Sequence, residues 1–230
     1  MFKRYAIYFT PPPGAFSQLA TAWLGWDLAQ GCAVPHPDIP GVNVAATTER
    51  PRKYGLHATI KAPCTLADGV TEQELTGALA AFCAAHPSVT LGGLGLTQIG
   101  RFLALTPVGD TSALNGLASA AMQSLDPFRA PLGEAEFNRK NRPNMSVRQR
   151  QLLRQWGYPH VEEFFRFHIT LTGPIPDAEL AQVRQAIEAY LMPAIPAPFD
   201  IDSLTLCGED MDSRFHQIAR FGLGKAANSL

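Results

Sequence analysis

Two short segments of the sequence carry a histidine and a threonine at the same spacing. His57 precedes Thr59 in the first segment, and His168 precedes Thr170 in the second. In an extended strand, residues two apart project to the same face, so each histidine has a threonine beside it. Imidazole takes up or releases a proton near neutral pH, and a threonine hydroxyl donates a hydrogen bond to an anionic oxygen. One such pair is more often structural than catalytic, but its recurrence favours chemistry.

Paired histidines suit the cleavage of a phosphodiester, in which the nucleophile and the leaving oxygen lie on opposite sides of phosphorus. If the segments face each other across a cleft, one histidine removes a proton and the other supplies one to the leaving oxygen. The threonines hold the non-bridging oxygens. Symmetry leaves open which histidine is the base. The sequence has no H-E-x-x-H motif and no acid directly beside either segment, so we expect neither a metal nor another cofactor.

The pairs belong to a longer internal repeat. The pattern H-x-T-[I/L]-x-[A/G]-P occurs at residues 57–63 and again at 168–174, and each copy is followed by a helical stretch, a strand pattern and an Arg-Phe pair. Self-similarity of this kind indicates duplicated structural units. We therefore predict one bilobal domain spanning 1–230, with repeats at approximately 1–100 and 101–230.

Periodicity and turn residues predict the elements that must position the motifs. Proline density predicts a long loop over residues 34–52, next to the first motif, and long loops in compact domains are often functional. The expected strands are 5–9, 56–62, 89–97, 102–105 and 199–207, and the expected helices are 17–30 (ended by Gly31), 71–85, 112–125 and 178–191.

The second repeat is longer than the first because of an insertion at 126–167. Within it, residues 139–154 hold six basic residues and no acid. Clustered positive charge in a mildly acidic protein steers anions, so Arg139 and Arg142 are candidate phosphate ligands. The alternative is a helix face in contact with water.

Neighbours of the two motifs supply further candidates. Strand alternation places Lys61 on the face of His57, and Arg166 and Thr172 on the face of His168. These side chains are predicted to contact phosphate, unless Lys61 and Arg166 lie at strand ends and point into water. Tyr54 would face the other side, but Gly55 could break the alternation and let the ring stack on a base or sugar.

Three segments together resemble a known family, the 2H phosphoesterase superfamily, which includes RNA 2′,5′-ligase-like and cyclic phosphodiesterase proteins. The segments are RYAIYF at 4–9, YGLHATIKAP at 54–63 and FRFHITLTGP at 165–174, and they are most similar to the DUF1045 branch. The resemblance implies an α+β fold, with two pseudo-twofold-related antiparallel sheets, helices outside and a central cleft. It also implies that the two histidines and two threonines are catalytic. Because the branch is associated with phosphonate metabolism, the implied substrate is a small cyclic phosphate of a ribose-type sugar or nucleotide.

Composition narrows the remaining possibilities. Hydrophobic residues make up 46% of the 230-residue chain and charged residues 17%, as in folded proteins. A net charge of −1 argues against a surface for long nucleic acids or anionic membranes. The sequence also has no apolar run long enough for a membrane span and no signal-peptide core, so we expect a cytoplasmic protein with a small phosphorylated substrate.

Two alternatives to a cyclic phosphodiesterase stay open. The first is RNA end processing, in which the basic insertion holds a short RNA strand. The second is a protein that binds a nucleotide or sugar phosphate without catalysis.

Overall fold

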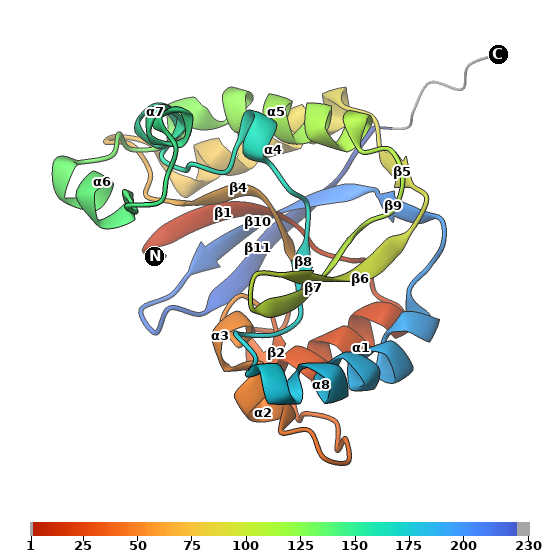
Figure 1. Cartoon of the computed structure of the whole chain (residues 1–230). Helices are drawn as coiled ribbons and strands as arrows, with labels where there is room; N and C mark the ends of the chain where they lie inside the picture. Colours follow the sequence, from red (N-terminus) through yellow and green to blue (C-terminus); the bar gives the residue numbers. More distant parts are fainter. Residues whose placement is uncertain (1, 225–230) are drawn as a thin grey trace.

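The computed structural model describes residues 2–224, whose strands form a central sheet between two groups of helices (Figure 1). The sheet has seven strands in the order β11-β10-β1-β4-β8-β7-β6, and every neighbouring pair is antiparallel. Its strands are β1 (Arg4–Phe9), β4 (Ala58–Cys64), β6 (Leu94–Ile99), β7 (Phe102–Pro107), β8 (Ile169–Thr170), β10 (Ser203–Glu209) and β11 (Phe215–Gly222). Two short ladders pair β2 (Trp26–Asp27) with β3 (Cys32–Ala33), and β5 (Val89–Leu91) with β9 (Phe199–Ile201).

The helices lie in two groups (Figure 1). In one group, α4 (Glu72–Ala85) contacts β10 and β11, and α5 (Ser112–Ser124) contacts β4. In the other group, Trp23 of α1 (Ala15–Leu24) donates a hydrogen bond to the Leu171 carbonyl, just after β8, and Arg184 of α8 (Asp177–Tyr190) donates one to the Leu96 carbonyl of β6. The shorter helices are α2 (Val44–Thr47), α3 (Glu49–Arg52), α6 (Glu134–Lys140), α7 (Val147–Trp156), η1 (Asp126–Phe128), η2 (Glu162–Phe164) and η3 (Met192–Ala194). Across residues 2–224, no helix is long and apolar enough to span a bilayer.

Apart from β11 at one edge, the strand order is symmetrical about the contact between β4 and β8. Strands β1 and β7 flank this pair, and β10 and β6 come next on either side. The last strand of the first repeat, β6, therefore pairs with β7 of the second repeat. Of the last strands of the second repeat, β10 pairs with β1 of the first repeat, and β11 pairs with β10. The predicted α+β class with antiparallel strands and outer helices is confirmed, and hydrogen bonds between β4 and β8 join the strands of both halves into one sheet.

One predicted helix is wrong in its extent. Instead of spanning 17–30, α1 ends at Leu24, and Trp26 begins β2. Gly25 takes a left-handed conformation with φ of 78°, and its N–H donates to the Thr21 carbonyl at 2.8 Å. This C-terminal cap stops the helix because glycine adopts positive φ without steric cost.

Three other predicted segments are divided in the structure. The strand expected at 89–97 is β5 and β6, separated at Gly92 and Gly93, and the strand expected at 199–207 is β9 and β10, separated at Asp202. The divisions let β5 and β9 pair with each other outside the main sheet. The segment 34–52 is not continuous loop, since α2 and α3 lie within it.

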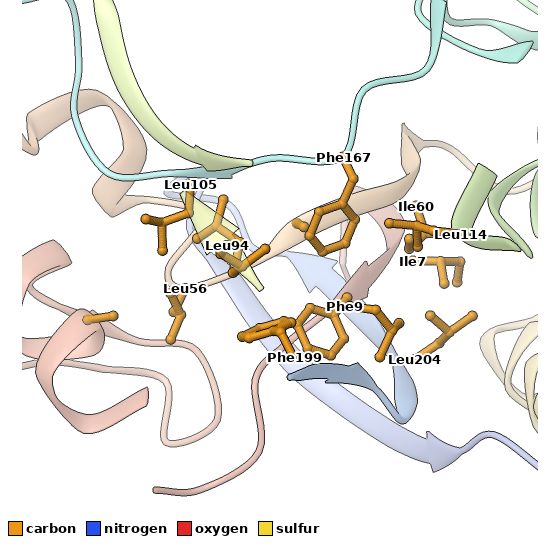
Figure 2. Close-up of a cluster of buried hydrophobic side chains, with 14 of the residues drawn as sticks. Ile7, Phe9, Leu56, Ile60, Leu94, Leu105, Leu114, Phe167, Phe199 and Leu204 are labelled. Carbon is orange, nitrogen blue, oxygen red and sulfur yellow. The ribbon is translucent and has the colours of Figure 1, made fainter. Parts of the chain in front are cut away.

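The core fixes which face of the central strands is available for chemistry. Figure 2 shows part of it, in which the ring of Phe9 lies 5.9 Å from that of Phe167 and 5.7 Å from that of Phe199. Burial of each such side chain contributes about 1.5–3 kcal/mol. Ala58 and Ile169 are also fully buried. Their neighbours along β4 and β8 must therefore face away from this core.

We expect Gly25→Ala to destabilise the fold more than Gly100→Ala. Both glycines have positive φ, so alanine is strained at either position, at a cost of about 1 kcal/mol. A Cβ on Gly25 would also lie 2.3 Å from the His36 ring, whereas nothing lies within 4 Å at Gly100. Urea denaturation measures the two free energies of unfolding. Equal losses would contradict the tight packing at the end of α1.

Candidate active site

The two motifs meet where β4 pairs with β8. Ala58 is the partner of Ile169 in this antiparallel pair, so His57 lies across from Thr170, and Thr59 lies across from His168. All four side chains share the face opposite the buried pair. We call His57, Thr59, His168 and Thr170 the His/Thr quartet. Its histidines occupy one diagonal and its threonines the other.

Backbone carbonyls orient both histidines in the same way. The Nδ1 atom of His57 lies 3.1 Å from the carbonyl oxygen of Gly55, and that of His168 lies 2.8 Å from the carbonyl oxygen of Arg166. Because a carbonyl only accepts, Nδ1 must carry the proton in each hydrogen bond. In the neutral ring, Nε2 then has a free lone pair. Each histidine can therefore exchange a proton through Nε2 while its backbone contact stays in place.

His57 is held in its neutral form. Burial lowers the pKa of His57 to about 4; the hydrogen bond to Gly55 partly opposes this shift, and the proximity of His168 adds to it. Its ring packs 4.0 Å from the ring of Tyr8 and 5.6 Å from that of Tyr54, measured between centroids. At neutral pH, His57 is thus a proton acceptor.

The quartet lines a hollow of about 430 Å³. Three cationic side chains share its wall, from Arg4, Arg50 and Lys140, and no acidic side chain within residues 2–224 lines it. A surface of this composition attracts anions. In the same part of the chain, no three His, Cys, Asp or Glu side chains come together as a metal site would require.

A second hollow, of about 530 Å³, adjoins the first and shares Thr59 and His168 with it. The insertion supplies most of its wall. The insertion residues there are Gln149, Tyr158, His160, Val161, Phe164, Phe165 and Arg166.

The structure brings some of the predicted neighbours to these hollows. Tyr54 lines the first hollow next to His57, and Gly55, which lies between them in the sequence, has φ of 64°, so extended alternation does not run from His57 back to Tyr54. Arg166 is exposed and lines the second hollow, beside His168. Contact of either side chain with a substrate stays a prediction.

Lys61 does not lie in the hollow with His57. Thr59 is the β1 partner of Tyr8, and Lys61 is the partner of Ile7, so β4 advances two residues where β1 advances one. This β-bulge at Ile60 shifts the alternation and turns Lys61 to the opposite face. There Lys61 is 6% exposed, and its Nζ donates to Asp126 Oδ1 at 2.9 Å and to the Met122 carbonyl at 3.2 Å.

Thr172 lies at the wall of the first hollow, but its hydroxyl is used within the protein. It accepts a hydrogen bond from the Leu103 N–H at 2.9 Å and donates one to the Gly173 carbonyl at 2.8 Å. The side chain is fully buried. Its role in the structure is to hold the start of β7 against the second motif.

The basic charges of the insertion are largely paired with acids that flank the basic run. Arg148 lies 2.7 Å from Glu163, Arg154 lies 2.9 Å from Glu134, and Arg139 lies 3.6 Å from Glu136. The sequence window 139–154 held no acid, but the acids lie just before and after it. The insertion therefore does not present six free cations.

The two candidate arginines of this insertion lie outside both hollows. The side chain of Arg139 is 71% exposed, and Arg142 is exposed as well. Lys140, which the sequence did not single out, is the basic residue of this run that reaches the first hollow.

Sequence reasoning also missed Arg50. The available signal was the long segment next to His57, which was predicted to be functional without a named residue. The Gly173 N–H donates to the Thr47 carbonyl at 2.7 Å, so the second motif holds this segment in place. That contact between residues distant in the sequence cannot be derived from spacing.

Comparison with known proteins gives the family. The model of the family described as "Protein of unknown function (DUF1045)" matches residues 59–216, which include Thr59, His168 and Thr170. The chain belongs to the DUF1045 family. Membership in DUF1045 agrees with the resemblance of the motif segments.

Two curated relatives carry the same name, ribose 1,5-bisphosphate phosphokinase PhnN. The protein from Janthinobacterium sp. (strain Marseille) is 38% identical over 90% of this chain and 48% of its own length. The protein from Laribacter hongkongensis (strain HLHK9) is 34% identical over 86% of this chain and 46% of its own length. The DUF1045 chain thus spans about half the length of the curated relatives it matches.

Solved structures with low sequence identity are also similar. E. coli LigT complexed with NADP+ is 15% identical, with a TM-score of 0.45 over 97% of this chain and 99% of that chain. The Thermus thermophilus protein TT0787 is 14% identical, with a TM-score of 0.46 over 97% of this chain and 100% of that chain.

The structural role of Thr172 predicts different outcomes for two substitutions. Thr172→Val keeps the shape but leaves the buried Leu103 N–H without its acceptor, so the free energy of unfolding should fall by about 1–3 kcal/mol. Thr172→Ser keeps the hydroxyl and should be closer to the wild type. Denaturant titration of both variants tests this. A valine variant as stable as the serine variant would contradict the assignment.

The environment of His57 predicts its titration. In an NMR titration, the ring signals of His57 should shift near pH 4 rather than near 6.5. The unfolded chain binds the proton more tightly, so the stability that His57 contributes is present above about pH 6.5 and is lost as the pH falls toward 4. His57→Gln should remove this part of the pH dependence. A midpoint near 6.5 would contradict the neutral state of this half-buried ring.

Proposed function

We propose that this DUF1045 protein is a metal-independent phosphodiesterase that opens a small cyclic phosphate of a ribose-type sugar or nucleotide. The observation that carries the proposal is the His/Thr quartet, in which both Nδ1 atoms are held by backbone carbonyls. Two proton carriers and two hydroxyl donors then line one cation-rich hollow. These are the groups that in-line opening of a phosphodiester requires.

In this proposal His57, whose lowered pKa keeps its ring neutral, acts as the base, and His168 acts as the acid. Nε2 of His57 takes a proton from water as the water oxygen bonds to phosphorus. The bond between phosphorus and the sugar oxygen breaks, and Nε2 of protonated His168 gives its proton to that oxygen. The product is a phosphate monoester with a free sugar hydroxyl. One proton then leaves His57 and another is taken up by His168, so the net reaction adds one water.

The threonines would stabilise charge during this reaction. Thr59 and Thr170 each lie across from a histidine, so their hydroxyls flank a phosphate placed between the two imidazoles. Donation to the non-bridging oxygens strengthens as charge develops on them, which lowers the barrier.

The curated relatives support a ribose phosphate as the substrate. Their name specifies ribose 1,5-bisphosphate, and we transfer the sugar phosphate chemistry, not the kinase activity, to this chain. The sequence has no G-x-x-x-x-G-K-[S/T] loop of the kind that cradles nucleotide phosphates. Phosphodiester opening therefore suits this chain better than phosphoryl transfer from ATP does.

The alternatives have less support. A short RNA strand would need free cations along the insertion, but Arg148 and Arg154 are paired with acids of the insertion itself. A protein that only binds phosphate would not need two histidines with Nε2 free to exchange protons.

We expect His57→Ala and His168→Ala each to lower kcat by about 10² to 10⁴ on the cyclic substrate, because each removes one proton transfer. EDTA should leave the wild-type rate unchanged. The control is His86→Ala, since the His86 ring stacks on Phe82 at 3.8 Å, away from both hollows. Full activity of either quartet variant, or loss of activity in EDTA, would overturn the proposal.

A further inference from the structure

The first hollow holds more positive charge than the proposed reaction uses. Arg4 comes from β1, Arg50 from α3 and Lys140 from α6, so three separate elements bring cations to one wall. A cyclic phosphodiester carries a single negative charge, and the quartet already supplies two imidazoles and two hydroxyls for it. The additional cations therefore need another explanation.

Arg50 differs from the other two cations in its partners. Arg4 forms two hydrogen bonds with the buried Glu209, one of them at 2.8 Å, and Lys140 pairs with Glu136 at 2.9 Å. Among residues 2–224, no group forms a side-chain hydrogen bond or salt bridge with Arg50. Its guanidinium retains all its donors for a ligand.

The backbone that carries Arg50 is nevertheless fixed. Besides the bond from Gly173 to Thr47, the Thr48 hydroxyl donates to the Val44 carbonyl at 2.8 Å, and Thr48 is fully buried. A Cβ added to Gly173 would lie 3.6 Å from the Cβ of Arg50, so Arg50 stands directly beside the second motif. The free cation is thus positioned at the rim of the quartet.

We propose that Arg50 is the main ligand of a second phosphate of the substrate, a terminal phosphate monoester separate from the cyclic phosphate, and that Lys140, which stays paired with Glu136, adds only its charge. A phosphate monoester carries close to two negative charges at neutral pH and offers three acceptor oxygens. A guanidinium binds two of these oxygens at once, and an ammonium adds a point charge. The hollow, at about 430 Å³, lies within the usual range for small-molecule sites.

This inference rests on the proposed function and specifies its substrate. The predicted substrate is a five-carbon sugar with a cyclic phosphate at one end and a phosphate monoester at the other. Arg50 is then a specificity residue, which acts on the substituent and not on the reacting phosphorus.

The test compares ribose 1,2-cyclic phosphate with the same compound phosphorylated at C5. Arg50→Ala should lower kcat/KM for the C5-phosphorylated substrate by about 10- to 100-fold, the effect of losing a charge-assisted hydrogen bond. It should leave kcat/KM for the unphosphorylated substrate nearly unchanged. Arg50→Lys should fall between the wild type and Arg50→Ala. The control is Arg101→Ala, which removes an exposed arginine outside both hollows.

Two outcomes overturn the inference. An equal loss on both substrates would mean that Arg50 acts at the reacting phosphate, and no loss on either would mean that it binds no phosphate. Calorimetric titration with ribose 5-phosphate tests the second phosphate site separately from the proposed function, because a binding measurement needs no turnover. Binding that weakens in Arg50→Ala supports the second phosphate site even if no cyclic phosphate is opened. If kcat/KM is the same with and without the C5 phosphate, and the same in the wild type and Arg50→Ala, the second phosphate site is wrong and the proposed function still holds.

Discussion

The pairing of Ala58 with Ile169 is the constraint on which the rest of the molecule depends. It joins the two halves of the sheet, and because both residues are buried, it turns the flanking histidines and threonines to the opposite face. A shift of one residue in this register would bury the quartet and expose the core residues. The same contact therefore specifies the fold and assembles the candidate site.

Around this nearly symmetrical quartet, the environment is not symmetrical. Tyr8 and Tyr54 pack against His57, and burial there lowers its pKa to about 4. His168 instead borders the second hollow, whose wall comes mostly from the insertion. The repeated motif supplies two similar proton carriers, and their unequal surroundings suit them to separate roles in the proposed reaction. The insertion thus lines the hollow beside His168, and most of its basic side chains are paired with acids.

How far the sequence predicts this site depends on whether each feature is local. The repeated H-x-T pattern and strand alternation place the four quartet residues correctly, since alternation is a property of one strand. The same rule fails at Lys61, because a bulge at Ile60 depends on how β4 pairs with β1. Arg50 and Lys140 could not be found from spacing, since long-range packing brings them to the hollow. The paired state of Arg148 was equally hidden, because its partners Glu162 and Glu163 lie 14 and 15 residues away.

The most direct test of the account follows the phosphorus atom itself. Ribose 1,2-cyclic phosphate, with and without a C5 phosphate, is incubated with the wild-type protein in EDTA and ¹⁸O-labelled water, and the products are followed by ³¹P NMR. The account predicts that the cyclic phosphate signal is replaced by that of a phosphate monoester carrying one ¹⁸O, because water attacks phosphorus and the sugar oxygen leaves. A cyclic phosphate signal that persists in both substrates would contradict it.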